Sequence, residues 1–215
     1  MAPDFEYFMA LEPYQILGHT TKGLFIQAIP LSLLLAFVFH RLIKEPLSNN
    51  LPSLFNMDKK SNAIIQDWNL PTVRSWIIFI LSVMIGFYSH VLLDGFTHKS
   101  GYFVMRYNFS QEYFIGIPVY KMLQHSLSLV GLILELTILL LLLRKTQVDH
   151  LYIRVRGRLK IKYWITVLLV TIITLTLKFL FSSSTNYIGM LVVSSISGFF
   201  LGIVVSSIIY RIRMQ

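Results

Sequence analysis

The chain contains no cysteine, so disulfide bonds and thiolate chemistry are excluded, and any metal site must use imidazole and carboxylate ligands. It is also poor in charge: only 13% of its 215 residues are Asp, Glu, Lys or Arg, against roughly 25% in soluble domains. Because 55% of the residues are hydrophobic, a soluble core of this size could not bury the apolar surface, whereas a lipid bilayer can cover it. The composition indicates an integral membrane protein.

The sequence is rich in long apolar runs. Five of them approach the ~20 residues that a membrane-spanning helix needs. They cover residues 23–40, 75–95, 126–143, 163–181 and 187–210. The first is short and contains Pro30. We expect an all-α polytopic bundle in contact with membrane lipids, in which residues 1–145 form a core with three spanning helices and residues 146–215 add two more.

The net charge of +9 could suggest a nucleic-acid partner, but the basic residues lie between the apolar runs, where they act as topology signals. If five helices alternate in direction, fourteen Lys and Arg residues fall on one side, in residues 41–74 and 144–162 and in the C-terminal tail. Four fall on the other side: Lys22, Lys99, Arg106 and Lys121. By the positive-inside rule we expect a multi-pass protein of the cell membrane with its C-terminus in the cytoplasm. Because the basic residues are explained by topology, we expect no nucleic-acid partner.

The imidazoles and carboxylates with the most chemical interest all fall on the side with few basic residues. They are Asp4, Glu6, His19, His90, Asp94, His98 and His125. They come from four separate segments, yet the charge-derived topology brings all of them to the outer membrane face. We therefore expect a polar pocket at that face.

Helical spacing makes a metal site the sharpest hypothesis for this pocket. His90 and Asp94 are four residues apart, so both project from one face of a helix. If the helix continues through Gly95, His98 joins that face; if Gly95 ends it, His98 lies on a turn that folds back over the site. Such ligands suit a divalent cation, with zinc favoured. A single His or Asp at a helix end is more often an interfacial or capping residue, so the hypothesis depends on the convergence of several segments.

Three further polar residues are interpreted differently. Glu135 lies inside the third apolar run, where a carboxylate costs roughly 2.5–3.5 kcal/mol, so it is either a buried, paired structural group or a relay residue. His40 and His150 fall on the basic side and are expected to be interface or loop residues.

Four stretches resemble the family known as domain of unknown function 4184, which consists of bacterial multi-pass membrane proteins. They are Met1 to Phe8, Gly18-His19-Thr20, the run Ser-His-Val-Leu-Leu-Asp-Gly-Phe-Thr-His from Ser89 to His98, and the segment from Gly116 to His125. The resemblance covers about residues 1–145, and the last two runs match only as generic hydrophobic helices. Family members usually carry a further N-terminal stretch with an early His, so either the start site is misassigned or that portion is lost.

The pattern is also similar to membrane-bound metal-dependent hydrolases distantly related to zinc-dependent phospholipase C. That similarity implies a metal site on the seven residues named above. The resulting hypothesis is metal-assisted hydrolysis of a lipid-linked or membrane-proximal substrate. His90, Asp94 and His98 would be ligands, joined by His19 and His125, and Asp4 or Glu6 would be a ligand or the general base.

The alternative is a non-enzymatic membrane protein, either a transporter or an assembly partner, whose His and Asp residues conduct ions or fix the bundle. A transporter needs a polar path past Glu135, but residues 136–143 are entirely apolar. A purely structural role predicts His and Asp side chains paired with one another.

Overall fold

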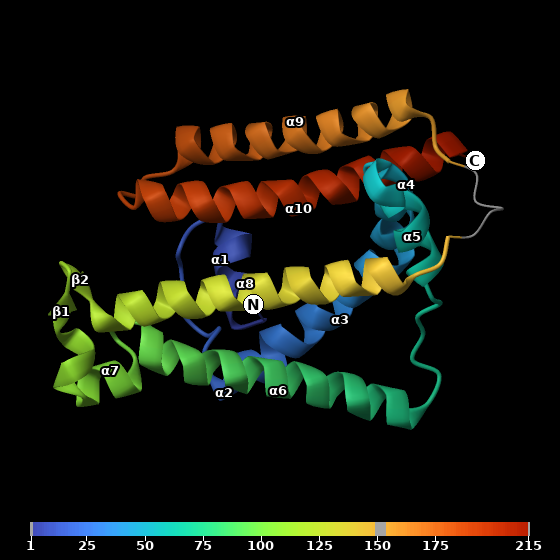
Figure 1. Cartoon of the computed structure of the whole chain (residues 1–215). Helices are drawn as coiled ribbons and strands as arrows, with labels where there is room; N and C mark the ends of the chain where they lie inside the picture. Colours follow the sequence, from blue (N-terminus) through green and yellow to red (C-terminus); the bar gives the residue numbers. More distant parts are fainter. Residues whose placement is uncertain (1, 149–153, 215) are drawn as a thin grey trace.

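The computed structural model describes residues 2–148 and 154–214, and helices make up nearly all of it (Figure 1). His150 lies outside the described residues. Within them, five helices are long and apolar enough to cross a membrane. They run over Thr21–Asn50, Val73–Arg106, Val119–Lys145, Gly157–Phe181 and Tyr187–Arg213. The predicted all-α bundle with five spanning helices is confirmed, and its apolar helices are those of a multi-pass membrane protein.

The first span is longer than the apolar run that predicted it. It is one continuous helical stretch composed of α2 (Thr21–Gly23), η2 (Leu24–Ala28), α3 (Ile29–Val38), η3 (Phe39–Ile43) and α4 (Lys44–Asn50). The π-helical turn η2 directly precedes α3, whose second residue is Pro30. Proline lacks a backbone N–H and would clash with the preceding turn of a regular helix. A wider turn at this point lets the helix continue through the proline.

The second and third spans lie side by side with a small cap between them (Figure 1). Helix α6 (Val73–Thr97) begins with a capping box, in which the Thr72 side chain accepts the backbone N–H of Ser75 and the Ser75 hydroxyl accepts that of Thr72. The cap consists of α7 (Tyr102–Arg106), with which the second span ends, η5 (Asn108–Gln111) and the antiparallel strands β1 (Tyr113–Phe114) and β2 (Ile117–Pro118). The third span is α8 (Val119–Lys145).

Helices α9 (Gly157–Phe181) and α10 (Tyr187–Met214) form the closest helix pair in the bundle (Figure 1). Gly198 and Gly202 of α10 face the α9 backbone: a Cβ added at Gly202 would lie 2.6 Å from the carbonyl oxygen of Val167. Farther along the same contact, the Ser207 and Tyr163 hydroxyls lie 3.0 Å apart. Small residues thus allow two backbones to approach closely, as is usual between helices in membranes.

The spans alternate in direction, so the loops that join them gather at two ends of the bundle (Figure 1). We call one the basic end: it is formed by residues 44–72, the start of α9 and the end of α10. There α4 turns back through η4 (Leu54–Asn56) into α5 (Met57–Ile64), and α4 and α5 together form a helical hairpin. Asp58, which is fully buried, lies 2.6 Å from the Lys160 amine and 3.0 Å from Arg154 Nε, and so ties this hairpin to the segment that leads into α9.

The N-terminal segment folds back into the bundle between α6 and α10. It comprises η1 (Ala2–Asp4), α1 (Phe5–Ala10) and the irregular residues 11–20. The hydroxyls of Ser197 and Ser194 donate to the carbonyl oxygens of Phe8 and Leu11, at 3.0 and 2.8 Å. Because these serines lie two or three turns inside α10, the segment reaches well into the bundle. Its contacts also connect residues 1–145 with residues 146–215.

Candidate metal centre

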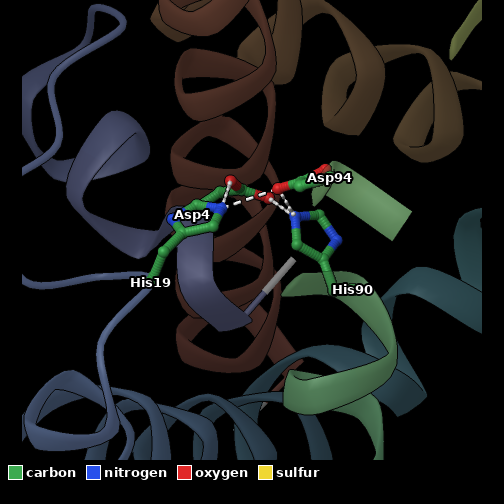
Figure 2. Close-up of side chains that lie close together, drawn as sticks. All are labelled: Asp4, His19, His90 and Asp94. Atoms are coloured by element: carbon green, nitrogen blue, oxygen red, sulfur yellow. Dashed lines mark hydrogen bonds and ion pairs between the residues drawn. The ribbon is translucent and has the colours of Figure 1, made fainter. Parts of the chain in front are cut away.

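Four potential metal ligands converge where the N-terminal segment meets the end of α6 that lies away from the basic end. Asp4 and His19 belong to the N-terminal segment, and His90 and Asp94 belong to α6. Figure 2 shows the four side chains pointing toward one another. One ligand atom from each lies within 4.8 Å of all the others. Two parts of the chain that are about 70 residues apart in sequence are thus brought to one point.

The distances within this group, which we call the His/Asp cluster, are short. Asp94 Oδ2 lies 2.7 Å from His19 Nε2 and 3.1 Å from His90 Nε2. The two oxygens of Asp4 lie 3.1 Å from His90 Nε2 and 3.8 Å from His19 Nε2. All four side chains are between 16% and 29% exposed, so the cluster is sheltered but not sealed from a small ligand.

Helix α6 explains half of the cluster. It runs through Gly95 and ends at Thr97, so His90 and Asp94 lie one turn apart on the same face. His98 is the first residue beyond the helix, and its backbone N–H donates to the carbonyl oxygen of Asp94. Its ring Nδ1 lies 3.3 Å from Asp94 Oδ1, the oxygen on the far side from His19 and His90. His98, at 46% exposure, therefore borders the cluster rather than sharing its centre.

Glu6 explains how His19 reaches the cluster. The Glu6 carboxylate accepts the backbone N–H groups of Ile16, Leu17 and Gly18, at 2.7, 2.9 and 3.0 Å. Burial raises the pKa of Glu6, but these three hydrogen bonds outweigh it and hold the pKa below its ordinary value. The carboxylate thus fixes the loop immediately before His19 and stays outside the His/Asp cluster itself.

Gly18 allows the close approach of this loop to Asp4. A Cβ at Gly18 would lie 2.1 Å from the carbonyl oxygen of Pro3, so any other residue would push the loop away. After His19, the Thr20 side chain accepts the backbone N–H of Gly23 and caps the first spanning helix. The short motif Gly18-His19-Thr20 therefore combines a close contact, a cluster residue and a helix cap.

Two residues near the third span are not brought to the cluster. His125 is exposed on α8 and is absent from the group of four. Its neighbour Gln124 instead reaches the cluster's border, with Nε2 lying 3.4 Å from His98 Nε2. Glu135 is exposed farther along α8, on an outward-facing stretch of the helix.

Tyr7 is a neighbour of the cluster that the sequence did not single out. Its hydroxyl donates to Gln15 at 3.0 Å. Burial raises the pKa of Tyr7, and the nearby negative charges of Asp4, Asp94 and Glu6 raise it further, so the phenol keeps its proton. The signal was weak because an aromatic residue in an N-terminal helix is usually a packing residue.

The cluster fits a divalent cation by its donor set and by its size. Two imidazole nitrogens and two carboxylate oxygens form a four-ligand set of the kind zinc accepts. The two negative charges of the carboxylates would balance the two positive charges of the ion. Ligand atoms that each lie about 2.0–2.1 Å from a tetrahedral zinc ion are about 3.3–3.4 Å apart. The His–Asp contacts of 2.7–3.8 Å bracket that separation, and the other pairs lie within 4.8 Å, so the side chains would have to shift to surround an ion.

Comparison with known proteins adds a family but no activity. A family model described as a domain of unknown function (DUF4184) matches residues 1–208. The match thus includes the fourth span and most of the fifth, and it exceeds the roughly 145 residues over which the resemblance was expected. No curated protein and no solved structure gives a significant match. The similarity to metal-dependent hydrolases therefore stays an expectation.

Proposed function

The chain belongs to the DUF4184 family of domains of unknown function, and we propose that it is a membrane-embedded, metal-dependent hydrolase. The single observation that carries the proposal is the convergence of Asp4, His19, His90 and Asp94, which bring one ligand atom each to within 4.8 Å of all the others. Two of these residues are on the N-terminal segment and two are on a spanning helix, so the site forms only in the folded protein.

In this proposal Asp4, His19, His90 and Asp94 hold the ion. A bound divalent ion polarises a phosphoryl or acyl oxygen and lowers the pKa of a bound water to about 7. Glu6 positions His19 through the loop at Ile16 to Gly18, rather than acting as a ligand or base. His125 has no role at the ion.

His98 is the residue placed to move a proton. Its Nδ1 faces Asp94 Oδ1 at 3.3 Å, so Asp94 can orient the ring and hold the proton on Nδ1. The other ring nitrogen, Nε2, then carries the basic electron pair. The Gln124 amide, 3.4 Å away, can donate to this nitrogen and would have to release it before Nε2 takes up a proton. A half-exposed imidazole in this state can accept a proton from a nucleophile next to the cluster.

The depth of the His/Asp cluster in the bundle indicates the substrate class. His90 lies two turns before the C-terminal end of α6, and the N-terminal segment enters the bundle beside it. A scissile bond must therefore come close to the membrane surface, which favours a lipid-linked or membrane-proximal substrate over a freely soluble one.

Metal content tests the proposal directly. Elemental analysis of detergent-purified full-length protein should find about one divalent ion per chain, and His90→Ala and Asp94→Ala should lose it. His98→Ala should keep the ion, since that ring borders the cluster. His125→Ala is the matched control, because it removes an imidazole of the same type that lies on α8 away from the cluster. If His90→Ala retains as much metal as His125→Ala, the metal site does not exist.

The hydrogen-bond lengths favour one competing role. Separations of 2.7 and 3.1 Å are also those of direct bonds between imidazolium and carboxylate groups, so the cluster could hold the N-terminal segment to α6 without an ion. In that case the purified wild-type protein contains no stoichiometric metal, and Asp4→Asn makes residues 2–20 sensitive to protease. Metal in the wild-type protein decides between the two roles.

A further inference from the structure

The basic end of the bundle carries two adjoining hollows that differ in chemistry. One, which we call the head pocket, has a volume of about 660 Å³ and is lined by polar and charged residues, among them Arg41, Lys44 and Arg211. The other, which we call the tail groove, has a volume of about 520 Å³ and is lined mainly by apolar residues, among them Leu33, Leu34 and Phe37. Arg41, Trp68 and Asn69 line both, so the hollows are continuous.

A single helical face runs along both hollows. Pro30, Leu34, Phe37, Arg41 and Lys44 recur at spacings of three or four residues along the first span, so they lie on one side of it. The face is apolar toward the middle of the span and basic at its end. Such a gradient matches a molecule with an apolar chain and a negatively charged head.

The charges in the head pocket leave two cations available. Arg211 lies 3.0 Å from Glu45 and is neutralised by it. Among the described residues, neither Arg41 nor Lys44 forms an ion pair, and the Lys44 amine donates only to the backbone carbonyl of Gln66. The exposed carboxylate of Asp67 is the remaining acid in the lining, so the pocket as a whole is positive.

Two tryptophans mark the level at which a lipid head would lie. Trp68 stacks on His40 with ring centroids 4.7 Å apart and lines both hollows, and Trp76, in the first turn of α6, lines the tail groove. Tryptophan side chains concentrate at the boundary between headgroups and acyl chains. The tail groove lies on the acyl side of these rings and the head pocket on the headgroup side.

We propose that the tail groove and the head pocket together form a binding site for one glycerophospholipid. The phosphate lies between Arg41 and Lys44, where the guanidinium can bind two of its oxygens at once, and one acyl chain lies along Leu33, Leu34 and Phe37. Free phosphate would leave the apolar groove uncovered, and a lipid without phosphate would leave the two cations without a partner. The site is at the opposite end of the bundle from the His/Asp cluster, so it does not depend on the proposed hydrolase.

The test titrates delipidated, detergent-purified protein with phosphatidylglycerol and detects the retained lipid by native mass spectrometry. Diacylglycerol with the same acyl chains and glycerol phosphate are titrated in parallel. We expect about one phosphatidylglycerol to be retained, and both partial molecules to bind much more weakly. Arg41→Ala/Lys44→Ala should weaken binding about thirtyfold, since each basic residue near an anionic headgroup contributes roughly a factor of five.

The matched control is Lys59→Ala/Lys60→Ala, which removes the same charge from α5 at the same end of the bundle but outside both hollows. It should bind phosphatidylglycerol like the wild type. Equal weakening by both double variants would reduce the effect to a diffuse surface charge and overturn the proposal. Equal binding of diacylglycerol, or of glycerol phosphate, would also overturn it, because the site would then recognise only half of the lipid.

A second pair of variants keeps the proposal testable if Arg41→Ala/Lys44→Ala fails to fold. Leu34→Trp fills the tail groove, whereas Leu136→Trp changes a leucine of nearly the same exposure on α8 (54% for Leu34 and 55% for Leu136). Only Leu34→Trp should lose the retained lipid. If delipidated protein dimerises and retains no added lipid, a second copy covers the groove and the lipid proposal is wrong.

Discussion

At the scale of single residues, the His/Asp cluster depends on side chains that do not belong to it. Both carboxylate oxygens of Glu6 accept hydrogen bonds from three backbone N–H groups, and these bonds fix the loop that ends in His19. Gly18 contributes by having no Cβ, because the carbonyl oxygen of Pro3 occupies the space. These supporting roles are invisible in a list of potential ligands.

Glu6→Ala should therefore weaken metal binding without removing any ligand. Three backbone N–H groups lose their acceptor, so residues 16–18 shift and His19 moves with them. We expect the metal affinity to fall about 10–100-fold, as is usual when a group that orients a ligand is removed. Isothermal titration with Zn²⁺ would measure this. Glu12→Ala, which removes a carboxylate of the same segment that pairs with Lys178, is the control and should bind zinc like the wild type.

At the scale of helices, contact between α9 and α10 is set by residues that are small rather than polar. A Cβ at Gly198 would lie 3.1 Å from the Cα of Thr171, and one at Gly202 would lie only 2.6 Å from the carbonyl oxygen of Val167. The serines of α10 form hydrogen bonds to two different neighbours. Ser206 and Ser207 bond to Tyr163 of α9, whereas Ser194 and Ser197 bond to the N-terminal segment. One helix thus fixes two different neighbours.

Gly202→Ala should destabilise the bundle, although alanine is the better helix former. The added methyl group meets the backbone of α9, and overpacking of this kind costs about 1–3 kcal/mol. Gly131→Ala on α8 is the matched control, because a Cβ there has nothing within 4 Å. Thermal unfolding in detergent should show a lower midpoint for Gly202→Ala alone. A similar change in both variants would mean that close contact between α9 and α10 does not limit stability.

At the scale of the whole molecule, Asp58 joins parts of the chain that are about a hundred residues apart. Its buried carboxylate meets Lys160, Arg154 and the Ser53 hydroxyl, and it accepts the backbone N–H of Lys59. Burial raises the pKa of Asp58, but the hydrogen bonds and the charge of Lys160 outweigh it, so the pKa lies below its ordinary value. The hairpin at the basic end is thereby held against α9.

This cluster predicts a loss of stability in acid. Because the pKa of Asp58 is lower in the folded than in the unfolded protein, its contribution is complete above the ordinary value of about 4 and is lost as the pH falls through the folded pKa. Asp58→Asn should remove this pH dependence and cost about 3–5 kcal/mol at neutral pH, since Lys160 stays buried without its partner. Unfolding measured between pH 3 and 7 checks both effects. Asp67→Asn, at an exposed acid in the same connection between the first two spans, should change neither.

Much of the fold follows from local sequence, because a spanning helix needs only an apolar run of sufficient length. The later four runs correspond to α6, α8, α9 and α10, whose ends extend a few residues beyond the apolar cores into polar flanks. The first span was underestimated by ten residues at its C-terminal end, because the polar residues of α4 continue the helix while packing against α5. Hydropathy carries no information about that contact.

The site was predictable in part for the same reason. His90 and Asp94 were expected on one face because of helix geometry. His19 was singled out because it lies just ahead of the first apolar run and belongs to a stretch that resembles the family. The sequence did not indicate which of the outer-face residues meet. In the structure Asp4 belongs to the cluster, Glu6 holds the loop before His19, His98 borders the cluster and His125 lies apart. His19, His90, Asp94, His98 and His125 were all predicted to be ligands, with Asp4 or Glu6 as a ligand or the general base. The structure groups only Asp4, His19, His90 and Asp94. Which residues meet depends on how the N-terminal segment packs.

The sequence by itself determined the number of spans, their alternation and the end of the bundle at which each ionisable residue lies, because length, hydropathy and helical period are local properties. Only the tertiary structure decided which of those residues share a space. That depends on where residues 2–20 enter between α6 and α10, through hydrogen bonds from Ser194 and Ser197 that join positions more than 180 residues apart. Contacts of such long range leave no periodic signal in the chain.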